Sequence, residues 1–258
     1  LLLANGRSYT LSVDAANPSV LQVGVSTIHA VSAAAALGLA VGGTAGVAVS
    51  GAGAVAYNEV LNSTLAQLSN GDASATGNVS VTATNTAAIS SIVAAVSLAV
   101  GAGGTAGVGA SIGIALARNW IGYTDDAPNL RAETRASVLD ASIDAGGDVK
   151  VQATAEQRIG ALVLSGSAAI AGGGTAGVAA SGSGVGANNR IAMNVTAEID
   201  GDRKGGIRGD AVSVLAADRS VINVFAGAAS IAASVGGTAG DAGAAATGTD
   251  GAGGAAGG

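Results

Sequence analysis

Few side chains in this chain could carry out acid–base, thiol or metal chemistry. The 258 residues contain no Cys, and His29 is the only His. His29 lies in an apolar run, and the nearest charged residues in the sequence are Asp14 and Glu59. A catalytic triad needs a base that is oriented by a carboxylate. A disulfide needs two Cys, and a typical zinc site needs Cys or several His. The sequence therefore predicts no catalytic residue, no zinc site and no enzyme activity.

Acidic residues gather in Gly-rich segments that are typical of turns. Calcium binds six to eight oxygen ligands, and the segment Asp200-Gly-Asp202 offers the best candidates, Asp200 and Asp202. The chain lacks the GGxGxD repeat of calcium-binding β-rolls. Solvated turns are the preferred interpretation, so no cofactor is predicted, and calcium is kept as the alternative.

The composition excludes several classes of protein. Apolar residues make up 49% of the chain and the net charge is only −6, whereas disordered chains are poor in apolar residues and highly charged. Eleven Lys and Arg against 17 Asp and Glu offer no basic footprint for nucleic acid. The first residue is not Met, so we expect a piece of a longer protein or a processed product.

An internal repeat organises the chain. The string GGTAG occurs four times, and its Thr falls at Thr44, Thr105, Thr175 and Thr238. The sequence keeps register on both sides of each copy, and the differences in repeat length fall outside that block. We predict a lead-in at 1–17 and repeats at 18–77, 78–147 with an insert near 120–130, 148–210 with a charged insert at 201–210, and 211–258 as a partial repeat.

The local periodicity is two. Apolar and polar residues alternate after Val79 and after Val149, which predicts strands with one buried face. The stretch 160–170 is apolar or small on both faces, which predicts a strand buried on both sides. GGTAG is expected to be a tight turn, because Gly is permitted conformations that other residues avoid.

These observations predict an all-β fold, a β-solenoid (parallel β-helix) of stacked repeats. One wide coil per repeat is favoured over three shorter coils, and an antiparallel β meander is the alternative. Equivalent residues would then stack as ladders along the axis. The predicted ladder residues are Thr44, Thr105, Thr175, Thr238, Asn58, Asn119 and Asn189.

The motif also resembles a known class of repeat. The segments that carry the resemblance are Val149-Lys-Val-Gln-Ala153, Gly173-Gly-Thr-Ala-Gly-Val-Ala-Ala-Ser181, Asn189-Arg-Ile191 and Thr196-Ala-Glu-Ile199, with their counterparts Gly103–Ser111, Asn119–Ile121 and Ala145–Asp148. They are similar to repeat regions of giant bacterial surface and secreted proteins of the filamentous-adhesin type. The resemblance implies export, a β-solenoid stalk and an adhesive or filamentous role at the cell surface or in the extracellular matrix, with no catalytic residues.

The predicted function is thus a structural or adhesive segment of a large exported bacterial protein, extracellular or on the cell surface. Uncapped solenoid ends expose strand edges that pair readily with another copy, so end-to-end self-association into a fibre is expected. A host surface or a glycan is the expected external ligand, and no nucleic acid is expected.

Two alternatives remain open. Residues 15–58, 73–117, 159–189 and 220–240 contain no Asp, Glu, Lys or Arg, which fits a membrane-inserted assembly of small residues. Alternation and the scarcity of aromatic residues disfavour membrane insertion. A carbohydrate-active β-helix enzyme is the other alternative, but it would need clustered charges on one sheet face.

Overall fold

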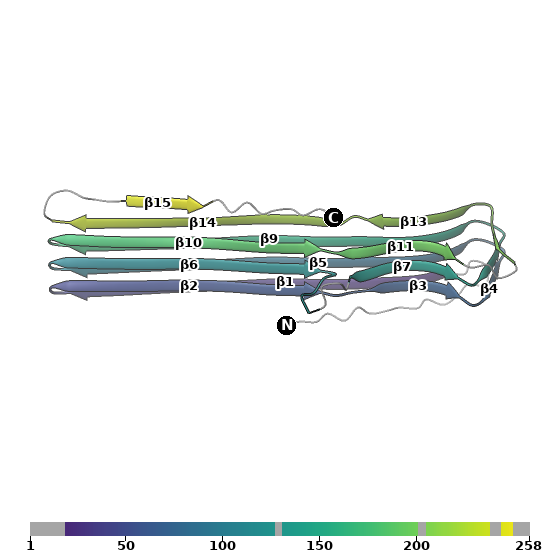
Figure 1. The fold of residues 1–258 in the computed structure, drawn as a ribbon, viewed down its shortest axis with the longest axis horizontal. Helices are drawn as coiled ribbons and strands as arrows, with labels where there is room; N and C mark the ends of the chain where they lie inside the picture. Colours follow the sequence, from purple (N-terminus) through teal and green to yellow (C-terminus); the bar gives the residue numbers. More distant parts are fainter. Residues whose placement is uncertain (1–18, 127–130, 201–204, 238–243, 250–258) are drawn as a thin grey trace.

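The chain is built from strands that lie side by side in long layers (Figure 1). The computed structural model describes residues 19–126, 131–200, 205–237 and 244–249, and these residues form no helix. Accordingly, the described part of the chain holds no helix with the length and hydropathy needed to cross a membrane. The all-β class predicted from the alternation is confirmed.

The largest sheet has six strands. Four strands lie side by side in the order β1-β5-β9-β14, and β15 pairs with the outer edge of β14. Strand β13 pairs with the first part of β9. Its members are β1 (Ser19–Gly42), β5 (Val79–Gly103), β9 (Val149–Gly173), β13 (Val212–Asp218), β14 (Val221–Gly236) and β15 (Ala244–Thr249).

Three further sheets have three strands each, in the orders β10-β6-β2, β11-β7-β3 and β12-β8-β4. The first contains β2 (Ala45–Val60), β6 (Ala106–Ile121) and β10 (Ala176–Ile191). The second contains β3 (Thr64–Ser69), β7 (Ala132–Leu139) and β11 (Met193–Asp200). The third contains β4 (Asp72–Ala75), β8 (Ser142–Ala145) and β12 (Ile207–Arg208).

Neighbouring strands come from corresponding positions around successive GGTAG strings. The register pairs Ser19 with Ser80, Val79 with Val149, and Val149 with Val212, all in parallel. An antiparallel meander would need antiparallel neighbours, and among the described strands only β14 and β15 pair in that way. The parallel sheets are compatible with a β-solenoid.

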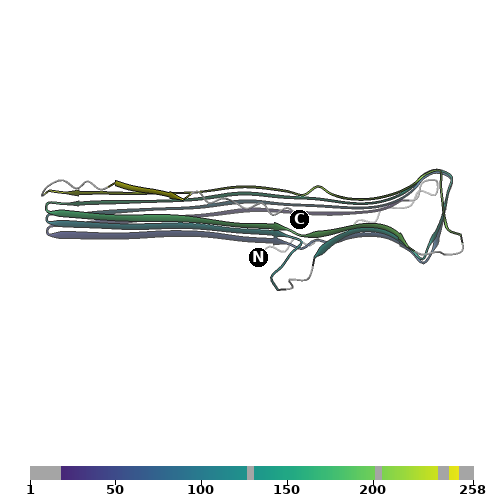
Figure 2. The same ribbon diagram turned by 45° about the horizontal axis from the view of Figure 1, so that its top comes forward.

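The two main layers lie close together over half of their length and diverge over the other half (Figure 2). We call the close half the arm and define it as residues 30–56, 91–117, 161–187 and 224–236; the other described residues up to 223 are the base. The arm contains no Asp, Glu, Lys or Arg. Its interior is lined mainly by Ala, Gly and Ser, because closely packed layers leave no room for larger side chains.

Larger apolar side chains fill the base, where the layers diverge. Its main core combines Val and Ile residues of β5, β8 and β9 with small residues of β3 and β7, including Val81, Ile143 and Val151. A second cluster around Ile89, Ile121 and Ile159 joins this core to the arm. The base therefore supplies most of the burial of large side chains.

The long alternation after Val79 forms the single strand β5, as predicted. At the arm's tip the chain turns at Gly43-Thr44, Gly104-Thr105 and Gly174-Thr175, so GGTAG is the expected tight turn. The expectation that 160–170 is buried on both sides is wrong. Its inward residues are covered, but Leu164 and Ile170 are 40% and 48% exposed, because none of the described strands covers the outer face. Small and apolar residues occur on both the inner and the outer face of this strand, so the sequence alone does not distinguish a covered face from an exposed one.

Candidate functional site

Three Asn side chains form a continuous row across β2, β6 and β10. The Asn58 Nδ2 donates to the Asn119 Oδ1 at 2.7 Å, and the Asn119 Nδ2 donates to the Asn189 Oδ1 at 2.7 Å. Asn119 is fully buried. The structure thus brings together the three Asn residues that the sequence singles out, and we call this row the Asn ladder.

The Asn ladder has a direction. Asn58 and Asn119 each donate from their Nδ2 to the Asn of the next strand along the axis. Asn58 therefore presents its Oδ1 acceptor at one end, and Asn189 presents its Nδ2 donor at the other end. These two ends are chemically complementary.

The Thr residues of the GGTAG turns stack at the tip of the arm through their backbones. The Thr105 nitrogen donates to the Thr44 oxygen at 2.8 Å, and the Thr175 nitrogen donates to the Thr105 oxygen at 2.9 Å. All three residues are exposed to solvent. Thr238, the fourth predicted member, lies outside the described residues.

The candidate metal and base residues do not form a site. Asp200 ends β11 and is exposed, and Asp202 lies outside the described residues. Within the described ranges, no group of three or more His, Asp or Glu side chains is placed to hold a metal ion. His29 is exposed on β1, the edge strand of its sheet.

A cluster of aromatic and charged side chains marks the junction between arm and base, next to the segment that follows β6. The Arg118 guanidinium lies 3.9 Å from the centroid of the Trp120 ring and 4.8 Å from that of Tyr57. The Arg190 guanidinium lies 3.7 Å from the centroid of the Tyr123 ring. We call this set the aromatic–arginine cluster: Tyr57, Arg118, Trp120, Tyr123, Asp125, Asn188 and Arg190.

Polar contacts fix the aromatic–arginine cluster in place. The Trp120 Nε1 donates to the Asn188 Oδ1 at 3.1 Å, and Arg118 pairs with Asp125 at 3.0 Å. Trp120 and Tyr123 are buried and meet edge to face with their centroids 4.9 Å apart. Tyr57 remains 61% exposed, so it is the aromatic ring of the cluster that an external ligand reaches most easily.

Sequence analysis missed this cluster. Register places Tyr57, Arg118 and Asn188 in one row, and Glu59, Trp120 and Arg190 in the next row but one. The signal was present in the residues that flank Asn58, Asn119 and Asn189 in the repeats. Alignment of the repeats at these Asn residues predicts that the aromatic and charged residues beside them lie on neighbouring strands.

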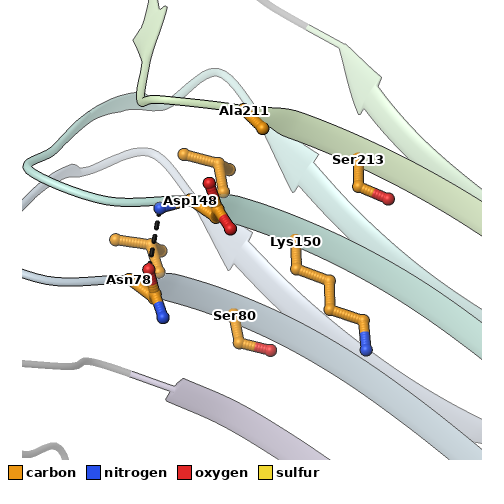
Figure 3. A pocket seen from close by; sticks show the side chains of 8 residues that line it. Asn78, Ser80, Asp148, Lys150, Ala211 and Ser213 are labelled. Carbon is orange, nitrogen blue, oxygen red and sulfur yellow. Dashed lines mark hydrogen bonds between the residues drawn. The ribbon is translucent and has the colours of Figure 1, made fainter.

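A shallow hollow of about 350 Å³ lies where β5, β9 and β13 begin (Figure 3). Its polar lining comes from Asn78, Ser80, Asp148, Lys150 and Ser213. The Asn78 Oδ1 accepts a hydrogen bond from the Asp148 backbone nitrogen at 2.8 Å, so its oxygen is already engaged in holding two turns together. Among the described lining residues, Lys150 and Asp148 carry charge.

One ion pair crosses between strands in the base. Arg135 on β7 donates from its Nε to the Glu198 Oε1 on β11 at 2.8 Å, and its Nη2 contacts the same oxygen. This hydrogen bond, together with the charges of Glu198 and Glu133, raises the pKa of Arg135 above its ordinary value, against the opposing effect of desolvation. The guanidinium is charged at neutral pH, so the pair stabilises the stacking of β7 and β11.

Both ends of the stack present strand edges. Strands β1, β2, β3 and β4 are the last strands of their sheets at one end, and β10, β11 and β12 at the other end. At that second end, β15 pairs with residues 228–233 of β14 and covers part of its edge.

Comparison of the chain with family models, curated proteins and solved structures found no match.

Proposed function

We propose that this chain is a β-solenoid segment, with one wide coil per sequence repeat, from a large exported bacterial protein of the cell surface or extracellular space. Its role is mechanical: copies or repeats stack end to end and form a stalk or filament. No catalytic role is proposed.

The parallel register between repeats is the observation that supports this proposal. Equivalent residues pair from β1 through β5 to β9, and from β2 through β6 to β10. The pairing pattern can repeat from coil to coil, because each complete coil offers the next one the same backbone edge. The fold is therefore suited to extension along its axis.

The Asn ladder adds direction to this stacking. A second copy placed on β10 through its own β2, with its β1 taking the place beside β9 that β14 holds in the single chain, would bring its Asn58 Oδ1 to the Asn189 Nδ2 of the first copy. The new hydrogen bond would repeat the two bonds already present within the chain. End-to-end assembly should therefore be head to tail.

Asn189→Asp tests this assembly. The carboxylate keeps an acceptor for the Asn119 Nδ2 but loses the outward donor, and it places a negative charge against the incoming Asn58 Oδ1. We expect the filaments seen by electron microscopy to disappear, and the dissociation constant from sedimentation to rise about 30-fold, which corresponds to about 2 kcal/mol.

Asn188→Asp is the matched control. It adds the same charge one residue away, and its carboxylate can still accept the hydrogen bond of the Trp120 Nε1. We expect filaments of this variant to form as those of the parent chain do. Equal loss of assembly in both variants, or a parent chain that stays monomeric at high concentration, would show that the ladder does not join copies.

The adhesive part of the proposal rests on the aromatic–arginine cluster. Aromatic rings combine an apolar face with polar partners and suit the mixed surface of a sugar. We expect a glycan or host-surface ligand to contact Tyr57. Glycan-array binding that is unchanged in Tyr57→Ala, or absent in the parent chain, would remove this part of the proposal and leave the mechanical role.

A further inference from the structure

The outer side of the arm in the largest sheet is apolar throughout. We call it the broad face and define it as the outward residues of β1, β5, β9 and β14 within the arm. Its exposed large side chains are Val31, Leu37, Leu39, Val41, Ile92, Val96, Leu164, Ile170, Phe225, Ile231 and Val235. Soluble monomers rarely expose so large a continuous apolar patch.

Register brings these side chains together into rows across the sheet. Val31, Ile92, Leu162 and Phe225 form one row. Leu39, Val100, Ile170 and Ala233 form another. No charged residue interrupts the face, because the arm contains none.

Two glycines of the broad face, Gly166 and Gly172, are not explained by packing against the described residues. A Cβ added to Gly166 or to Gly172 would meet no atom within 4 Å. Neither residue has a positive φ, so alanine would fit both positions. Glycine inside a strand weakens the strand. At these two positions the broad face therefore has room for side chains of a facing sheet.

The size of the broad face matches a protein–protein contact. Four strands about 4.8 Å apart and about 12 residues long at about 3.3 Å per residue cover roughly 750 Å². A stable interface buries about 800 Å² on each partner. The opposite face of the arm has one strand fewer and ends at the aromatic–arginine cluster.

We propose that the broad face packs against the broad face of a second copy of this chain, so that two arms pair laterally with their sheets about 10 Å apart. The absence of charge removes repulsion between the arms, and the charged bases remain in water.

A lipid bilayer is a poorer occupant for the same face. Insertion of the arm would carry the edges of β1 and β2 into hydrocarbon, where unpaired backbone groups are costly. Face-to-face pairing leaves both edges at the margin, in contact with water or with the next coil. The second copy is therefore the favoured occupant.

Val96→Lys tests the pairing at the centre of the broad face. All measurements use the Asn189→Asp background, so that end-to-end assembly does not contribute and the two proposals can fail separately. Val96 is 57% exposed, and Ile112 on the opposite face of the arm is 58% exposed, so Ile112→Lys is a closely matched control. We expect sedimentation equilibrium to show a dimer whose dissociation constant rises at least about 100-fold in Val96→Lys, equivalent to about 2.7 kcal/mol, and changes less than about threefold in Ile112→Lys.

Every other result overturns the pairing. A background chain that is monomeric at about 100 μM, far above the dissociation constants of specific complexes, overturns it. Dissociation by Ile112→Lys, alone or together with Val96→Lys, rejects the broad face as the specific contact. A monomer that binds phosphatidylcholine vesicles, and loses that binding in Val96→Lys, assigns the face to lipid instead.

A second measurement does not depend on the folding of Val96→Lys. Because the chain has no Cys, Ser90→Cys provides a single site for a nitroxide label at the border of the broad face. Pulsed electron paramagnetic resonance should show one discrete distance between two copies. Absence of an inter-copy distance at concentrations where the background chain sediments as a dimer would reject face-to-face pairing.

Discussion

Asn119 links two neighbours within the Asn ladder and is fully buried. Asn119→Ala would leave the Asn58 Nδ2 and the Asn189 Oδ1 without their partner. Because an unsatisfied buried polar group costs about 1–3 kcal/mol, we expect the free energy of unfolding to fall by about 2–3 kcal/mol. Urea unfolding followed by circular dichroism measures this change. Asn58→Ala removes one ladder bond instead of two and leaves one polar atom, the Asn119 Oδ1, without its partner, so it should cost about 1–2 kcal/mol; a loss equal to that of Asn119→Ala would contradict the central role of Asn119.

Facing Ser residues bridge the two layers of the arm, except in the first repeat. Ser97 pairs with Ser111, and Ser167 pairs with Ser181, each at 2.6 Å between hydroxyl oxygens. In the first repeat, Ala36 occupies the row of Ser97, and the buried Ser50 hydroxyl has no partner.

Ala36→Ser should restore this bridge and raise the free energy of unfolding by about 1 kcal/mol, the typical net value of one hydrogen bond. Ala34→Ser is the control, because its hydroxyl would enter the apolar cluster that contains Ala52 and should destabilise the chain. Thermal unfolding of both variants measures these changes. A lower free energy of unfolding for Ala36→Ser would show that the interior cannot accept the added oxygen.

Among the elements, the turn at the tip depends on glycines where the two layers approach most closely. A Cβ at Gly101 would lie 2.0 Å from the Val108 backbone oxygen, whereas a Cβ at Gly160 on β9 would meet nothing within 4 Å. Gly101→Ala should therefore lower the free energy of unfolding by about 2–3 kcal/mol through overpacking. Gly160→Ala should raise it by about 0.5 kcal/mol. Chemical denaturation measures both, and a well-tolerated Gly101→Ala would mean that the layers separate easily at the tip.

The strands were the most predictable part of the molecule. Alternation from Val79 and from Val149 identified β5 and β9, and the spacing of GGTAG matched the register between strands. The exposure of Leu164 and Ile170 could not be predicted, since alternation does not say whether a second layer covers the outer face. The aromatic–arginine cluster escaped notice because its members belong to different repeats, and only the register brings them together.

For the molecule as a whole, the uneven distribution of charge predicts different properties for the proposed lateral contacts and the proposed end-to-end contacts. The arm carries no charged residue, while the base holds ion pairs such as Arg135–Glu198 and Arg219–Glu156. Lateral contacts should therefore be insensitive to salt, since ions screen interactions between charges and leave apolar contacts in place. The proposed end-to-end contacts would use backbone edges and the Asn ladder, and they would run at right angles to the proposed lateral contacts.

Strand β15 would oppose the proposed extension at one end of the stack. It pairs antiparallel with residues 228–233 of β14 and so helps to hold β14 in the place beside β9 that an added coil would give to its own copy of β1. Ala246→Pro removes a backbone donor in the middle of β15 and should release this edge. We expect filaments to form at about tenfold lower protein concentration, corresponding to about 1.4 kcal/mol, as measured by light scattering. Ala246→Ser keeps the donor and should behave as the parent chain does. If Ala246→Pro assembles no better than Ala246→Ser, β15 does not compete with an incoming coil, and growth proceeds through the edges of β10 and β11.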